Sequence, residues 1–61
     1  MSATKLKTTR KKQGLTQEYI AEKAKITVMS YQRYEDGKRI PRADKAKLIA
    51  KALNSTVEEL F

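Results

Sequence analysis

The stretch "TQEYIAEKAKITVMSYQRYEDG", Thr16 to Gly37, decides the fold of this chain. Thr16 and Thr27 each stand before a run whose apolar residues recur at helical spacing, and Gly37 closes the second run. A threonine in that position accepts a hydrogen bond from a free backbone N–H of the first helical turn. Glycine ends a helix because it takes the left-handed conformation without steric cost. The stretch therefore predicts two short helices joined by a tight corner.

Each helix start also carries a hydrophobic staple, in which an apolar residue just before the cap packs against another in the second turn. The pairs are Leu15 with Ile20 and Ile26 with Tyr31. Because both staples fix where a helix begins, only a few residues remain for the corner. On the first of the two helices, the expected buried residues are Ile20, Ala21 and Ala24.

Three further helices are expected, because apolar residues recur at helical spacing and no segment alternates with a period of two. The first spans residues 5–13 and ends at Gly14, and the second spans residues 42–53 after Pro41. The last begins at Ser55, where "STVE" forms a capping box with Glu58. The helix after Pro41 is expected to bury Ala46, Ile49, Ala50 and Leu53.

The predicted fold class is therefore all-α, with five short helices on one core and a helix-turn-helix formed by the second and third. A chain of 61 residues forms one domain, here expected over residues 1–61 with residues 1–4 flexible. The last helix offers Val57, Leu60 and Phe61. Leu60 and Phe61 either close the core or form a dimer seam.

The composition excludes most catalytic chemistry. The chain has no cysteine and no histidine, so it lacks disulfides, thiolate metal sites and the commonest general base. A domain this small hardly builds both a core and a deep pocket. We therefore expect no enzyme activity, cofactor, metal or small-molecule substrate. No apolar run approaches the roughly 20 residues of a membrane span, and no secretory signal is present, so we expect a cytoplasmic protein without membrane contact.

The charge of the chain is strongly and unevenly positive. The net charge is +7 and the isoelectric point is about 9.9. Residues 1–15 carry five basic side chains and no acid, and residues 38–51 carry six against Asp44 alone. A basic excess of this size favours a polyanion as partner, although a merely solvated surface has the same composition.

The third predicted helix has two chemically different sides when its residues are placed 100° apart. Tyr31 and Tyr34 fall on one side, together with Ser30 and Glu35. Because tyrosine is large and amphipathic, this side is expected to be the buried one. The opposite side carries Val28, Met29, Gln32, Arg33 and Asp36.

An apolar pair beside a hydrogen-bonding pair suits the major groove of duplex DNA, which presents thymine methyl groups and polar base edges together. Arginine matches guanine and glutamine matches adenine in two-bond contacts, each worth about 1–3 kcal/mol of discrimination. The first residues of a recognition helix reach the bases, so the predicted base-contacting residues are Thr27, Val28, Met29, Gln32 and Arg33. Alternatively, Val28 and Met29 are ordinary exposed apolar residues, or they bury against the C-terminal helix or a partner protein.

Nearly the whole chain resembles the helix-turn-helix domains of phage repressors and Cro proteins, the XRE-type regulators. The most specific matches are "GLTQ", the "IA" that follows it, and "YEDGKRIP" at the end of the third helix. The resemblance implies a compact five-helix, lambda-repressor-like domain from a phage or mobile element. It also implies binding to double-stranded operator DNA, with a possible homodimer on the DNA.

The resemblance assigns roles to further residues. The residues implied to contact the DNA backbone are Gln17, Lys38, Arg39 and Arg42. Gln17 alternatively contacts a base, or is a solvated residue of the first turn. A structural ion pair is implied between Arg10 and Glu35.

Three places depart from the family pattern. Lys25 occupies the corner where glycine is usual, and a left-handed lysine costs on the order of 1 kcal/mol unless the turn differs. Asp36 replaces a frequent asparagine, and its carboxylate would repel a phosphate. Ala43 and Ala46 stand where bulkier residues are frequent, which suggests a light core.

The sequence thus predicts a sequence-specific transcriptional regulator, most simply a repressor that binds an inverted-repeat operator through its third helix. The alternative is an antitoxin-type helix-turn-helix protein that binds a partner toxin and its own promoter. A nonspecific basic nucleic-acid-binding protein would explain the charge, but not the side chains on the outer side of the third helix.

Overall fold

The computed structural model describes residues 4–61. Its helices are α1 (Thr4–Lys12), α2 (Gln17–Ala24), α3 (Val28–Glu35), α4 (Ala43–Ala52) and α5 (Val57–Leu60). The all-α prediction is confirmed, with boundaries shifted by one residue at several ends. Thr4 is the first residue of α1, and the rest of the stretch expected to be flexible lies outside the described residues. No helix in residues 4–61 is long and apolar enough to span a bilayer.

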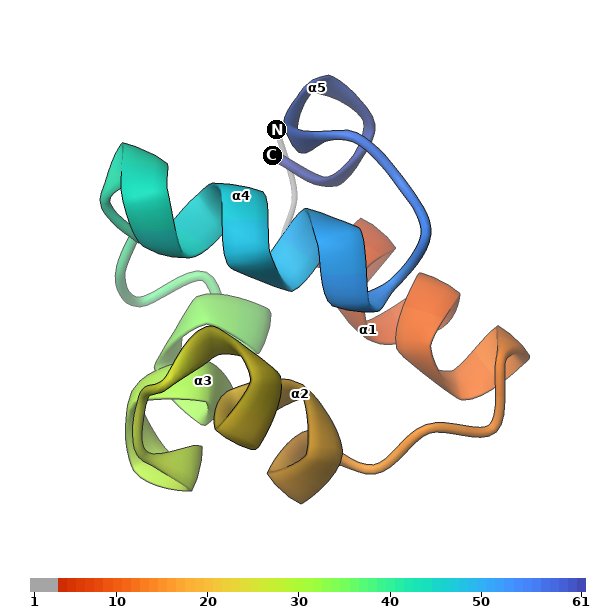
Figure 1. Ribbon diagram of the computed structural model, residues 1–61, viewed down its shortest axis with the longest axis horizontal. Helices are drawn as coiled ribbons and strands as arrows, with labels where there is room; N and C mark the ends of the chain where they lie inside the picture. The colour runs from red at the N-terminus through yellow and green to blue at the C-terminus, as the bar shows by residue number, and fades with distance from the viewer. Residues whose placement is uncertain (1–3) are drawn as a thin grey trace.

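The five helices surround one core. In Figure 1, α4 crosses the middle of the molecule, with α2 and α3 on one side of it and α5 on the other. α1 packs against both α3 and α5. The buried core cluster consists of Leu6, Ile20, Ala21, Ala24, Tyr31, Ile49, Ala50, Leu53 and Leu60. This arrangement leaves one side of α3 on the surface.

The core contains the residues that the helical spacing predicts. All three expected residues of α2 are buried, and so are Ala46 and Leu53 at the two ends of the α4 stripe. Leu6, the main apolar residue of α1, is fully buried. Leu60 is also buried, while Val57 and Phe61 pack against the cluster, so the last helix closes the core.

One residue in each interhelical connection takes the left-handed conformation. The φ angles are 70° at Gly14, 59° at Lys25, 76° at Gly37 and 51° at Asn54. At the α2–α3 corner, the Ile26 N–H donates to the Ala21 carbonyl (3.0 Å) and the Lys25 N–H donates to the Glu22 carbonyl (3.1 Å). These two bonds form a Schellman motif. The corner therefore keeps the usual turn and accepts a left-handed lysine in it.

Three helices begin at threonine caps. The hydroxyl oxygens of Thr16, Thr27 and Thr56 accept hydrogen bonds from the backbone N–H groups of Tyr19, Ser30 and Glu59. The third cap corrects the prediction that Ser55 caps the last helix. The Ser55 N–H donates to the Ala50 carbonyl (2.9 Å) and so belongs to the turn that ends α4. Thr56 is then the residue free to start α5.

Candidate nucleic-acid interface

α3 separates its side chains into an inner face and an outer face. On the inner face, Tyr31 is fully buried and Glu35 is 6% exposed. On the outer face, Met29 is 62% exposed, and Gln32 and Arg33 are also exposed. The predicted division of this helix therefore holds at these five positions.

Two of the predicted base-contacting residues, Val28 and Thr27, have side chains that are partly engaged within the domain and so are less accessible to a base. Val28 was expected to point outward, but it is half-buried and packs against the core cluster. It lies one turn before Tyr31, and residues three apart are neighbours on a helix surface, so it borders the inner face. Thr27 is exposed, but its hydroxyl accepts from the Ser30 N–H (3.1 Å) and donates to the Ser30 Oγ (3.0 Å).

The remaining three residues of the predicted set lie on one exposed surface, which we call the outer face of α3 (Met29, Gln32 and Arg33). The Arg33 Nη2 donates to the Met29 Sδ at 3.7 Å. Sulfur is a weak acceptor, so this contact orients the guanidinium without saturating its donors. The face thus combines a long apolar side chain with a glutamine and an arginine, two residue types whose side chains are able to make two-bond contacts.

Arg10 and Glu35 form a buried ion pair behind this face. The Arg10 Nε donates to Glu35 Oε2 (2.6 Å), its Nη2 donates to Glu35 Oε1 (3.4 Å), and its Nη1 donates to the Leu15 carbonyl (2.8 Å). The pair therefore joins α1, the connection before α2, and α3. Burial raises the pKa of the Glu35 carboxyl, but hydrogen bonds from Arg10 and Gln17 outweigh it and leave that pKa below its ordinary value.

Gln17 connects the buried pair with the outer face. It is half-buried, and its Nε2 donates to Glu35 Oε1 at 2.9 Å. Its Oε1 accepts from the Gln32 Nε2 at 3.1 Å. The sequence predicts a DNA contact for Gln17 but does not reveal its hydrogen bonds with Glu35 and Gln32. The one available signal was its place in the first turn of α2, and nothing in sequence spacing reveals that this turn faces α3.

Tyr31 contributes a polar atom to the same interior. Its hydroxyl is buried and has no hydrogen-bond partner among residues 4–61. Burial raises the pKa of this hydroxyl, so it stays protonated. Its side chain is fully buried and belongs to the core cluster, on the side of α3 opposite the outer face.

The basic residues after α3 begin directly at the end of that helix. The backbone N–H groups of Lys38 and Arg39 donate to the Arg33 carbonyl, at 2.9 and 3.4 Å. Lys38, Arg39 and Arg42 all have exposed side chains. Arg42 lies 3.8 Å from Asp44 in an exposed ion pair, and such pairs are worth little in water. This basic segment therefore stands beside the outer face with its charges accessible.

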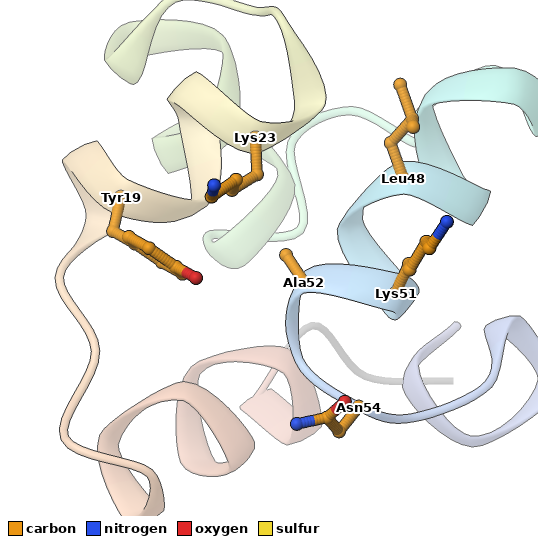
Figure 2. A pocket seen from close by; sticks show the side chains of 6 residues that line it. All are labelled: Tyr19, Lys23, Leu48, Lys51, Ala52 and Asn54. Carbon is orange, nitrogen blue, oxygen red and sulfur yellow. The ribbon is translucent and has the colours of Figure 1, made fainter.

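A shallow groove of about 390 Å³ lies elsewhere on the surface, between α2 and α4 (Figure 2). Its lining residues are Tyr19, Lys23, Leu48, Lys51, Ala52 and Asn54. The Lys23 Nζ lies 5.4 Å from the centre of the Tyr19 ring, a cation–π contact. The lining includes no carboxylate and no residue of α3.

Comparison with protein families decides the class to which this fold belongs. A helix-turn-helix family model, HTH_3, matches residues 6–60. The chain belongs to this helix-turn-helix family. No curated protein and no solved structure matches the chain significantly. This XRE/Cro/C1-type family is a DNA-binding, non-enzymatic one, and the predicted membership is confirmed.

Proposed function

We propose that this domain is a transcriptional repressor that binds a specific operator by placing α3 in the major groove. The observation that carries this proposal is the outer face of α3, where Met29, Gln32 and Arg33 are exposed side by side. The methionine suits a thymine methyl group, while the arginine and the glutamine suit guanine and adenine edges. Within residues 4–61, their polar contacts are the Gln32–Gln17 bond at 3.1 Å and the Arg33–Met29 contact at 3.7 Å, and none of the three residues is buried.

The basic segment supports the same orientation on DNA. Lys38 and Arg39 extend from the turn that closes α3, and Arg42 stands at the N-terminal end of α4, where its side chain makes no capping hydrogen bond. With the outer face in the groove, we expect these three cations to lie toward the phosphates along its edge. Such contacts set affinity and register, whereas the outer face sets sequence. The net charge of +7 steers the domain to DNA before any base is read.

We further propose that the domain acts as a homodimer on an inverted repeat. Ile40 is 86% exposed, the largest exposed fraction among the large apolar side chains of residues 4–61. It lies within the basic segment, where an apolar side chain does not serve phosphate binding. We propose that a second copy covers it; on an inverted repeat, the two α3 helices of such a dimer must reach half-sites about 34–36 Å apart.

The test begins with selection of binding sites from a random duplex library by the full chain. Binding of the selected duplex and of a scrambled duplex is then measured by fluorescence anisotropy near 0.15 M salt. Arg33→Ala should weaken binding to the selected duplex by roughly 5- to 150-fold and change binding to the scrambled duplex far less. A selection that returns no preferred sequence would overturn the proposal.

Lys38→Ala provides the matched comparison for a cation outside the outer face. It should weaken both duplexes about equally and reduce the salt slope by roughly one. Equal losses on both duplexes from Arg33→Ala would assign this arginine to phosphate contact and remove it from base reading.

An antitoxin-type function is the second candidate, and the groove between α2 and α4 supports it. Its lining combines two lysines, Lys23 and Lys51, with the apolar side chains of Leu48 and Ala52. That combination suits an acidic, apolar segment of a partner protein. Under this alternative, Lys51→Glu would abolish binding to the product of the gene beside its own and leave binding to the selected duplex within about threefold.

A further inference from the structure

The outer face of α3 holds a sulfur atom that is accessible to solvent and adjacent to a guanidinium. Met29 is 62% exposed, and its Sδ accepts from the Arg33 Nη2 at 3.7 Å. The two residues stand four positions apart, so they are neighbours on the helix surface. The chain has no cysteine, and the Met29 Sδ is the one sulfur atom in residues 4–61. An oxidant that reaches this face therefore meets a thioether, with no thiol in the described chain to react first.

We propose that Met29 is an oxidation site, and that its modification by hydrogen peroxide releases the domain from its operator. This inference rests on the proposed function and adds regulation to the same face. A sulfur lone pair attacks one oxygen of the peroxide, and an S–O bond forms as the O–O bond breaks. The departing hydroxide takes the proton of the transferred oxygen and becomes water. Sulfur is thereby oxidised by two electrons to a sulfoxide while the peroxide is reduced to water.

Oxidation makes the apolar part of the outer face polar. A sulfoxide oxygen is a hydrogen-bond acceptor, whereas the thymine methyl group that suits Met29 has no donor to offer it. The oxygen must lose its water to approach that methyl group, and removing a polar group from water without a new partner is unfavourable. The sulfoxide carries no net charge, so the attraction between the basic side chains and the phosphates is retained.

The new oxygen also competes with DNA for Arg33. It is bonded directly to the Met29 Sδ, so a donor 3.7 Å from that sulfur reaches it by a small side-chain rotation. A guanidinium makes a stronger hydrogen bond to such an oxygen than to a thioether sulfur, which is a weak acceptor. Neither ion pair of residues 4–61 includes Arg33, so no carboxylate holds it elsewhere. We therefore expect the sulfoxide to take the Arg33 Nη2 out of the two-bond contact with guanine.

The test treats the full chain with hydrogen peroxide until mass spectrometry shows one added oxygen on the peptide that contains Met29. Oxidation should weaken binding to the selected duplex by about 5- to 150-fold and change binding to the scrambled duplex far less. The melting temperature should stay unchanged, because Met29 lies outside the core cluster. Reduction by methionine sulfoxide reductases that act on both epimers should restore the affinity.

Met29→Leu is the matched control, because it keeps Met1 as a methionine and so reports any effect of oxidation outside α3. Whatever its starting affinity, peroxide treatment should leave the affinity of Met29→Leu unchanged. In Arg33→Ala, oxidation of Met29 should cause a smaller fold loss than in the wild type, because no guanidinium remains to be diverted. The proposal is overturned if complete oxidation of Met29 leaves the affinity for the selected duplex unchanged, weakens both duplexes equally, or acts equally in Met29→Leu. An equal fold loss in Arg33→Ala would overturn the competition for Arg33.

A measurement without DNA tests the new hydrogen bond itself. In the free wild-type chain, oxidation should slow the exchange of the Arg33 guanidinium protons with water, because the sulfoxide oxygen then holds one of them. The backbone amides of α4 should stay in place in the same ¹⁵N spectra. Unchanged exchange at Arg33 after complete oxidation of Met29 would contradict the proposed hydrogen bond. The proposed function fails separately, if the unoxidised wild-type chain shows no sequence preference.

Discussion

The eight residues of α3 divide into an inner face that is buried in the core and an outer face that is exposed. On the inner face, Tyr31 and Glu35 are buried and contact groups from other helices. On the outer face, the one polar contact that Met29 and Arg33 make within residues 4–61 is with each other. The difference teaches that stability and recognition are separable here. Substitutions on the inner face should unfold the domain, whereas those on the outer face should change only what it binds.

The largest expected effect tests the inner face. Glu35→Ala leaves the Arg10 guanidinium buried without its partner, and breaking such a pair costs about 3–5 kcal/mol. A domain of this size holds only about 3–5 kcal/mol in total. Thermal denaturation followed by circular dichroism should therefore show a largely unfolded chain at 25 °C.

Arg33→Ala is the outer-face counterpart and should change the free energy of unfolding by no more than about 0.5 kcal/mol.

Replacing the whole ion pair, Arg10→Met with Glu35→Leu, should recover most of the stability lost in Glu35→Ala, because no charge is then left buried. A Glu35→Ala variant that melts at the wild-type temperature would contradict the claim that the inner face holds the domain together.

Acid should destabilise the domain by protonating the Glu35 carboxylate on the inner face. The pKa of Glu35 is lower in the folded chain than its ordinary value of 4.5, so its ionised form stabilises the fold. That contribution is complete above the unfolded-state pKa and disappears as the pH falls through the lower folded-state pKa. Urea denaturation between pH 7 and pH 2 should show a steeper acid loss in the wild type than in Glu35→Gln. Parallel curves would contradict this assignment.

A smaller effect on stability than that of Glu35→Ala is expected in the connections between helices, which belong to neither face. Lys25 is left-handed at φ 59°, so Lys25→Gly should raise the free energy of unfolding by up to about 1 kcal/mol. Gly14→Ala is the reverse change at φ 70°, where an added Cβ meets nothing within 4 Å, and it should lower stability by a similar amount. Each should shift the melting temperature by about 4–8 °C. Neither should alter DNA affinity, as anisotropy with the selected duplex would show.

Local signals made most of the fold predictable from the sequence. Caps, staples and helix-ending residues act over four or five positions, so Thr16 and Thr27 could be placed without knowledge of the packing. The same approach failed at Ser55, because both it and Thr56 can cap a helix. The choice depended on the left-handed Asn54, which commits Ser55 to the end of α4.

The candidate site was less predictable, because its details depend on contacts between helices. The helical wheel separated Tyr31 from Arg33 correctly, but it could not show that Val28, at the edge of the wheel, packs against the core. It also treated Gln17 and Gln32 as independent, although 15 positions separate two amides that bond directly. Contacts of this kind follow from how α2 crosses α3 and have no counterpart in the spacing of the sequence.

The central claim is that the outer face of α3 reads DNA, and titration of the ¹⁵N-labelled chain with its selected duplex tests it most directly. We expect the largest amide shift changes in residues 27–33, smaller ones in residues 38–42, and little change in α5. A titration that saturates while the amides of residues 27–33 stay in place and another surface responds would contradict the claim.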